Sequence, residues 1–256
     1  MVLVQSYVDS SKVIMKNLFV IILLTCSILS ANEADEIMKK VDNNLRGKNI
    51  YIKLTMNISS KYHKRTMKIE SYSQGEEKSF VKILYPPKDK GITFLSLDNN
   101  MWQYVPKIER VIKIPPSMML QNWMGSNITN DDMVRQSSIT EDYDATIIKK
   151  EANIVSIELI PKEEATVVWG KIISEIDIST YTSKKDIYYD EDNEIVRVFF
   201  YDKVKKFGEY YIPTYWRIEP ADQTNNYTEI ILEDVKYDIN ISEQYFKKSA
   251  LKRFSR

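Results

Sequence analysis

Few residues of this chain are suited to catalysis or metal binding. His63 is the only histidine and Cys26 the only cysteine, so a zinc site or a nucleophile–histidine pair has almost no candidates. Asp190, Asp192 and Glu194 alternate in a short acidic run that could bind calcium only weakly, because the EF-hand spacing and its glycine are missing. The sequence therefore gives no positive sign of an enzyme, and we expect no catalytic residue, no cofactor and no resident metal.

Two carboxylate pairs, Asp131-Asp132 and Glu163-Glu164, are adjacent in sequence. Neighbouring side chains on extended backbone point to opposite sides, so these pairs are poor acid–base partners. The chain also lacks a glycine-rich loop that could cradle phosphate.

The most distinctive segment runs from Met101 to Asp132. Two short strand-like runs lead into bulky apolar side chains that follow no regular period, namely Met118, Met119, Leu120, Trp123 and Met124. Thioethers and indoles adapt to irregular partners, so this composition favours an adaptable apolar surface over a rigid active site.

This segment also resembles a known family. The motif order W-x-Y-x-P, R, F-M-G-S, D is followed here by Trp102-Gln103-Tyr104-Val105-Pro106, then Arg110, then Trp123-Met124-Gly125-Ser126. That order is similar to the signature of the outer-membrane lipoprotein-sorting family, the LolA-like periplasmic carriers. The resemblance implies a half-open barrel of roughly eleven strands, plugged by helices. It also implies a lid arginine, for which Arg46, Arg65 and Arg110 are the candidates.

The resemblance extends to the partners and to the C-terminus. The branch it resembles accompanies large membrane exporters, so the implied cargo is a lipid, a lipoprotein or another hydrophobic solute. The implied partners are an inner-membrane exporter and an outer-membrane acceptor. The run from Ile239 to Phe246 resembles the closing segment of the family.

The N-terminus has the layout of a signal peptide. Met15-Lys16-Asn17 gives a charged start, Leu18 to Leu29 is apolar and too short to span a membrane, and Ser30-Ala31 offers a cleavage site. We expect cleavage after Ala31 and a natural start at Met15, which leaves residues 1–14 outside the protein. A membrane-anchored lipoprotein acylated at Cys26 is the alternative.

Charge and cysteine content constrain the mature chain. Removing residues 1–31 takes away the only cysteine together with Asp9, Lys12 and Lys16, which moves the formal net charge from +0 to about −1. Nucleic acid as a partner is disfavoured, because phosphate binding needs a basic excess. We expect a periplasmic monomer whose stability comes from its core and not from disulfides.

Hydrophobic periodicity predicts one helix followed by many strands. Asn32 to Gly47 has apolar residues at helical spacing on one face, and Ile50 to Ile58 alternates strictly with period two. A short C-terminal helix is expected at Ser242–Lys248, and hairpin turns at 190–193 and 204–208. Further strands are expected at 64–72, 79–85, 92–97, 101–105, 109–114, 144–149, 153–160, 172–178, 185–190, 195–202, 209–218 and 227–237.

These elements predict a mainly β (α+β) fold in a single domain, residues 32–256. No strand–helix–strand alternation occurs, so a parallel sheet is disfavoured. We expect one curved antiparallel sheet forming a half-open barrel, plugged by the N-terminal helix and by a short lid segment at Met118–Met124.

The leading functional hypothesis is a carrier of acyl chains. Burial is worth about 0.8 kcal/mol per methylene, so a sixteen-carbon chain gains roughly 13 kcal/mol before any costs. The residues expected to form the cavity and lid are Ile52, Leu54, Met56, Phe80, Phe94, Trp102, Tyr104, Met118, Met119, Trp123 and Met124. The alternatives are a periplasmic sensor or interaction module accessory to a membrane exporter and, third, an enzyme using the half-barrel as its substrate cavity.

Overall fold

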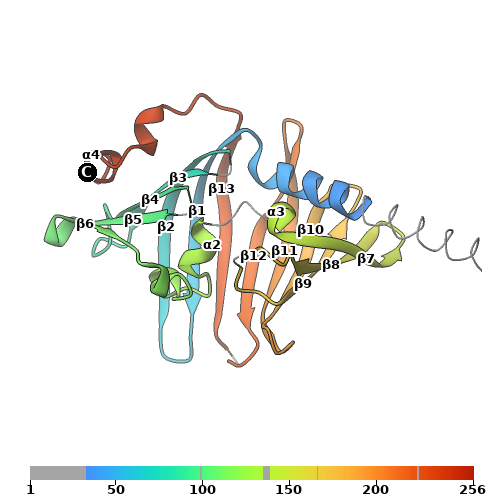
Figure 1. Cartoon of the computed structure of the whole chain (residues 1–256). Helices are drawn as coiled ribbons and strands as arrows, with labels where there is room; N and C mark the ends of the chain where they lie inside the picture. The colour runs from blue at the N-terminus through green and yellow to red at the C-terminus, as the bar shows by residue number, and fades with distance from the viewer. Residues whose placement is uncertain (1–32, 76, 99, 135–138, 166, 224) are drawn as a thin grey trace, which may run out of the picture.

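The computed structural model describes residues 33–75, 77–98, 100–134, 139–165, 167–223 and 225–256. Within these ranges one antiparallel sheet of thirteen strands curves around an N-terminal helix at residues 33–46 (Figure 1). The strands are β1 (Asn49–Ser59), β2 (Lys64–Gln74), β3 (Lys78–Tyr85), β4 (Thr93–Leu97), β5 (Asn100–Val105), β6 (Arg110–Lys113), β7 (Tyr143–Glu151), β8 (Ile154–Pro161), β9 (Lys171–Asp177), β10 (Thr182–Tyr189), β11 (Ile195–Phe207), β12 (Tyr210–Pro220) and β13 (Tyr227–Tyr237).

The strand order divides the sheet into two meanders. β1 to β6 run outward in one direction, while β7 to β13 run back from the opposite edge. The first and last strands therefore pair at the centre, where Ile50 lies opposite Tyr237, and β6 and β7 form the two edges. The sheet does not close, which gives the half-open barrel that the sequence predicts.

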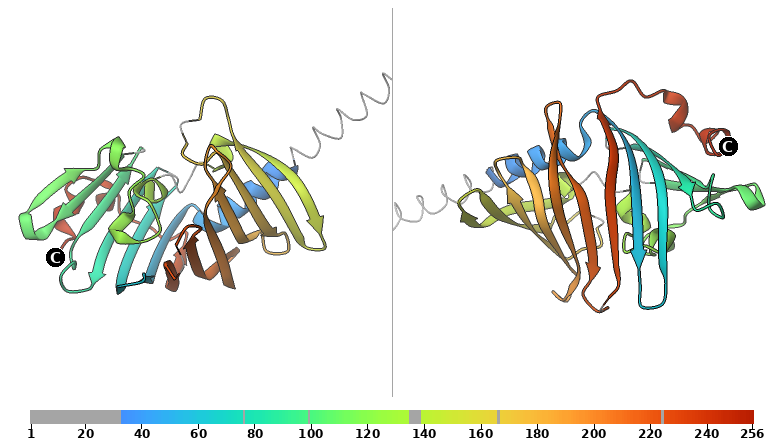
Figure 2. Two further views of the ribbon diagram at one scale, coloured as in Figure 1. Left: turned by 90° about the horizontal axis from the view of Figure 1, so that it is seen from below. Right: turned by 180° about the vertical axis from the view of Figure 1, so that it is seen from behind.

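The connection between β6 and β7 must cross the open side of the sheet, because it joins the two edges. We call residues 114–142 the crossing segment. Its described part contains short helical turns at η2 (Pro116–Met118), η3 (Trp123–Gly125), α2 (Asn130–Val134) and α3 (Ile139–Asp142). These turns occupy the hollow of the sheet together with the N-terminal helix (Figure 2).

The main core lies between the concave face and these covering elements. The N-terminal helix buries Ala34, Ile37, Met38 and Val41, which recur at helical spacing and so share one face. The sheet contributes inward-facing residues from nearly every strand, such as Met67 on β2 and Ile212 on β12.

A second apolar cluster lies on the outer face of β3 to β5. There the C-terminal segment, with η4 (Glu243–Phe246) and α4 (Ala250–Arg253), packs against the sheet. Thr93 Oγ1 donates a 2.7 Å hydrogen bond to the carbonyl oxygen of Leu251, and the ring of Tyr245 stacks on that of Tyr72 at 4.3 Å between centroids. This half of the sheet is thus covered on both faces.

The strand predictions are confirmed in all thirteen segments, while some details differ. The count of roughly eleven strands implied by the resemblance is too low. The turn expected at 204–208 is shorter, because β11 continues to Phe207 and the reversal occurs at Gly208 and Glu209. The helix expected at Ser242–Lys248 is instead two short turns, since Lys247 is extended (φ −111°, ψ 147°). That break lets Phe246 and Leu251 both face the sheet.

The predicted signal peptide, residues 1–31, and Asn32 lie outside the described residues. Among the helices of the described part of the chain, none is long and apolar enough to cross a membrane.

The docking of the C-terminal segment can be tested with Leu251→Ala. Leu251 has no exposed surface, so its truncation should lower the free energy of unfolding by roughly 2–5 kcal/mol in urea titrations. Lys247→Ala, an exposed position of the same segment, is the control and should change it by less than about 0.5 kcal/mol. Equal, small effects would show that the segment adds nothing to the core.

Candidate functional site

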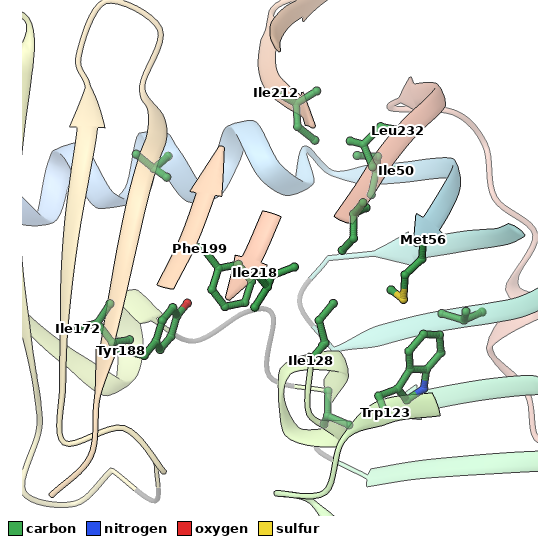
Figure 3. Packing of buried hydrophobic residues seen from close by; sticks show 14 of the residues in the cluster. Ile50, Met56, Trp123, Ile128, Ile172, Tyr188, Phe199, Ile212, Ile218 and Leu232 are labelled. Atoms are coloured by element: carbon green, nitrogen blue, oxygen red, sulfur yellow. The ribbon is translucent and has the colours of Figure 1, made fainter. Parts of the chain in front are cut away.

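A cavity of about 280 Å³ lies between the N-terminal helix, the concave face and the crossing segment. Side chains from both halves of the sheet and from the crossing segment point toward this space, with Met56, Trp123 and Ile128 on one side and Tyr188 and Phe199 on the other (Figure 3). Further apolar groups that line it are Met38, Val41, Leu45, Ile50, Ile52, Leu54, Ile69, Val81, Val134, Leu159, Val167, Trp169, Ile172, Ile212, Trp216, Ile230 and Leu232.

Four of the residues that the sequence predicts for the cavity line it. Ile52, Leu54 and Met56 project inward from β1, and Trp123 reaches it from the crossing segment. Trp123 is only 1% exposed and packs on Phe94, with 5.1 Å between ring centroids. Phe94 therefore supports the wall from behind Trp123.

The predicted methionines lie around the crossing segment. Met119 and Met124 are partly buried and pack against the main core, whereas Met118 is 37% exposed. The backbone at Met124 adopts a left-handed conformation (φ 52°), which turns the chain immediately after Trp123. The three methionines thus differ in burial and do not form a continuous apolar lid.

Phe80, Trp102 and Tyr104 lie on the opposite face of the sheet. They belong to the outer cluster beneath the C-terminal segment and do not line the cavity. Successive strand residues point to opposite faces, so Val81 faces inward while Phe80 faces outward. Both faces of this half of the sheet are covered, so apolar residues occur at odd and even strand positions alike. Alternation alone therefore could not tell which of these residues face the cavity.

Arg65 on β2 holds the crossing segment from one side. Its Nη1 donates to the carbonyl oxygen of Met124 at 2.7 Å, while Nη2 pairs with Asp89 at 2.7 Å. Of the other two arginines suggested for a lid, Arg46 pairs with Asp42 on the N-terminal helix, and Arg110 is exposed on β6. Arg65 is thus the candidate that contacts the predicted lid segment.

Arg197 on β11 holds the crossing segment from the other side. Both terminal nitrogens of its guanidinium pair with the carboxylate of Asp132 at 2.6 Å. The guanidinium carbon also lies 4.3–4.9 Å from the ring centroids of Trp169, Tyr188 and Phe199. Burial alone would lower the pKa of Arg197, but the charge and hydrogen bonds of Asp132 outweigh it and raise that pKa.

Asp132 has a second task within the crossing segment. Its carboxylate accepts a 2.7 Å hydrogen bond from the backbone N–H of Thr129, and Thr129 Oγ1 accepts one from the N–H of Asp132 at 3.1 Å. This reciprocal pair is a capping box that starts α2. One carboxylate therefore starts the helical turn and ties it to the sheet.

A polar cluster interrupts the apolar wall on the β9–β11 half. Asp186 accepts a 2.5 Å hydrogen bond from Ser174 Oγ, and Ser183 and Tyr201 are the other hydroxyls within its reach. Burial raises the pKa of Asp186 above its ordinary range, exceeding the lowering effect of hydrogen bonds from Ser174, Tyr201 and Ser183. We call these four residues the Asp186 cluster.

The remaining chemical candidates lie away from the cavity. His63 is exposed in the turn between β1 and β2, and the 190–194 run forms a turn in which Asp190 Oδ1 accepts the N–H of Glu194 at 2.9 Å. Across the described residues, no group of three or more histidine, cysteine, aspartate or glutamate side chains is placed to hold a metal ion.

Sequence reasoning missed the roles of Arg197 and Asp186. The signal for Arg197 was present, because it shares a strand face with Phe199 and Tyr201, and a charge on an apolar face requires a partner. For the Asp186 cluster, an irregularity of β10 brings Ser183 to the same face as Asp186, which period-two reasoning cannot reveal.

Comparison with known proteins places this architecture among LolA-like structures. A DUF1329 family protein from Desulfovibrio piger superposes with a TM-score of 0.79 at 21% identity, over 87% of this chain and 99% of that one. A domain from Vibrio parahaemolyticus assigned to outer membrane lipoprotein sorting gives 0.77 at 19% identity, over 87% and 100%. A LolA superfamily protein from Nitrosomonas europaea gives 0.71 at 18% identity, over 85% and 98%.

The sequence comparisons are less informative about activity. A family model described as "Uncharacterized protein" matches residues 75–253. None of the curated proteins matches the chain. The structural likeness confirms the fold that the sequence resemblance predicts.

The Arg197–Asp132 pair generates a stability prediction. Asp132→Ala leaves a buried guanidinium unpaired, so it should cost roughly 3–5 kcal/mol in urea unfolding. Adding Arg197→Met should restore part of this loss, since the uncompensated charge is then removed. Glu151→Ala breaks the exposed pair with Lys149 and is the control, expected to cost no more than about 1 kcal/mol.

The Asp186 cluster generates a pH prediction. A carboxyl whose pKa is raised on folding stabilises the protein most below its unfolded pKa of about 3.9, and this stability is lost as pH rises through the folded pKa. Asp186→Asn does not titrate there. The difference in Tm, variant minus wild type, should therefore increase as pH rises above about 4. A difference that stays constant or shrinks between pH 4 and 8 contradicts the raised pKa.

Proposed function

We propose that this chain, which belongs to the family whose model matches residues 75–253, is a carrier that binds the acyl chain of a lipid or lipoprotein in its half-barrel. The observation that carries the proposal is the apolar cavity enclosed by the N-terminal helix, the sheet and the crossing segment. Each methylene moved from water into such a space contributes about 0.8 kcal/mol. The ligand contacts that we propose from the predicted set are Ile52, Leu54, Met56 and Trp123.

Loading requires the crossing segment to move. The cavity of about 280 Å³ lies near the lower end of ligand pockets, which span roughly 300–1,000 Å³. Trp123 fills one end, so its displacement would extend the space toward Phe94. The contacts of Arg65 with Met124 and of Arg197 with Asp132 oppose this movement. We assign to them the role of holding the empty carrier closed.

The compartment and partners belong to the same proposal. A cleaved signal peptide at residues 1–31 would deliver the chain to the periplasm, where acyl chains need a soluble carrier between membranes. The partners would be an inner-membrane exporter and an outer-membrane acceptor. A non-enzymatic role is supported by the position of His63, which is exposed and is not among the residues that line the cavity.

One observation favours the interaction module as a second candidate. The edge strand β6 is exposed along its whole length, with Val111 and Ile112 39% and 40% exposed, and Ile108 in the turn before it is 55% exposed. An exposed strand edge with apolar side chains is suited to pairing with another chain. Such an edge also suits a carrier that docks on its exporter, so it does not weaken the first proposal.

A charge placed in the cavity should abolish binding. Leu54→Asp puts a carboxylate into an apolar pocket, which costs several kcal/mol and should weaken binding of an apolar fluorescent dye roughly 100-fold or more. Ile231→Asp is the matched control, because Ile231 is 38% exposed on the neighbouring strand β13 and does not line the cavity. The control should bind as the wild type does.

The native cargo can be sought directly. Organic extracts of the mature protein purified from the periplasm should contain acyl chains by mass spectrometry, and Leu54→Asp protein should lack them. A folded Leu54→Asp variant that binds dye and retains acyl chains would overturn the carrier proposal.

A further inference from the structure

The Asp186 cluster is built into the cavity wall by a local irregularity of β10. Ser183 and Asp186 are three residues apart, a spacing that puts side chains on opposite faces of a regular strand. The register shifts between Ser183 and Lys185, so Ser183 lies opposite Ile176 and Asp186 opposite Ser174. Both polar side chains consequently face the cavity, together with Ser174 of β9. Bulges that redirect side chains in this way are frequent beside functional sites.

The hydrogen bonds of the cluster have a direction. Ser174 Oγ donates to Asp186, and the hydroxyls of Ser183 and Tyr201 lie near enough to that carboxyl to lower its pKa. A hydroxyl has one proton and two lone pairs, so a hydroxyl that donates to Asp186 keeps an acceptor lone pair for a ligand. When Asp186 is ionised, the cluster therefore offers hydrogen-bond acceptors to the cavity and not donors.

The charges around the cluster disfavour an anionic ligand. Within the described ranges, no ion pair joins Asp186 to a lysine or arginine, and Glu175 is the acidic residue that raises the pKa of Asp186 from nearby. Arg197, the buried cation on β11, is engaged by Asp132. A carboxylate or phosphate head group would meet lone pairs here without a compensating cation.

We propose that the Asp186 cluster is a polar subsite of the cavity that accepts a hydrogen bond from a hydroxyl or amide N–H of an acyl-chain ligand. The inference rests on the proposed carrier function and names its ligand class: an amphiphile whose polar group donates a hydrogen bond inside the cavity. The apolar wall holds the chain, and the cluster selects among chains by the group they carry. The cluster is 8% exposed at Asp186 and 2% at Ser174, so a lost hydrogen bond there is not replaced by bulk water.

Matched amphiphiles test the subsite on the purified full chain. 1-Hexadecanol and hexadecanamide carry a donor, whereas hexadecyl methyl ether and N,N-dimethylhexadecanamide have the same chain without one. Each is titrated as a competitor of an apolar dye. The wild type should bind each donor roughly 3–10 times more tightly than its matched partner, which is the value of one net hydrogen bond. Comparing the alcohol and amide pairs shows which donor is preferred.

Variants of the Asp186 cluster test whether it causes the preference for donor ligands. Asp186→Leu should bind both members of each pair equally, while Ser73→Ala, on the other half of the cavity wall, should keep the wild-type preference for donor ligands. Where Asp186→Leu does not melt cooperatively, Tyr201→Phe and Ser183→Ala are tested in its place. They should reduce the preference for donor over non-donor ligands.

Each result decides between the two proposals. Equal binding of donor and non-donor ligands by the wild type overturns the subsite and leaves the carrier in place. A donor preference that survives in the cluster variants also overturns it. Failure of every amphiphile and of the dye to bind overturns the carrier function itself.

Discussion

The whole architecture depends on one topological constraint, which is that the two edge strands are consecutive in the chain. β6 and β7 lie at opposite ends of a thirteen-stranded sheet, so the residues between them have to span its open side. A curved sheet with an apolar concave face cannot leave that face in water. The same connection that topology requires therefore also supplies the cover, and the N-terminal helix completes it. The cavity is the space that these elements leave unfilled.

Holding such a cover in place demands specific contacts, because its short helical turns have little stability of their own. The structure uses two arginines from opposite halves of the sheet, Arg65 and Arg197, to contact the crossing segment. Asp132 combines a helix cap with a buried ion pair, so the local conformation of α2 and its position on the sheet depend on the same carboxylate. Aromatic rings around Arg197 exclude water from this pair and strengthen it.

Much of the fold was predictable because most inward strand positions are apolar. Alternation identified every strand, and helical spacing identified the N-terminal helix. The same rule failed for Phe80, Trp102 and Tyr104, since the C-terminal segment buries the outer face of β3 to β5 and removes the contrast between the faces.

The polar parts of the site were harder to predict from sequence. The pairing of Arg197 with Asp132 joins residues far apart in the chain, and only the fold brings them together. The Asp186 cluster depends on a register shift of one residue in β10, which leaves no mark in the composition of the strand. Long-range pairing and local irregularity are the two features that periodicity does not encode.

The central pairing of β1 with β13 also governs the order in which the chain can acquire its structure. Each meander consists of neighbouring hairpins and can form locally, but the seam between them joins residues such as Ile50 and Tyr237 from the two ends of the domain. Contacts of such high sequence separation form slowly, since a long loop has to close first. A chain still emerging from a ribosome therefore lacks the strand that completes its sheet. The seam between the two meanders can form only after β13, at Tyr227–Tyr237, has been made.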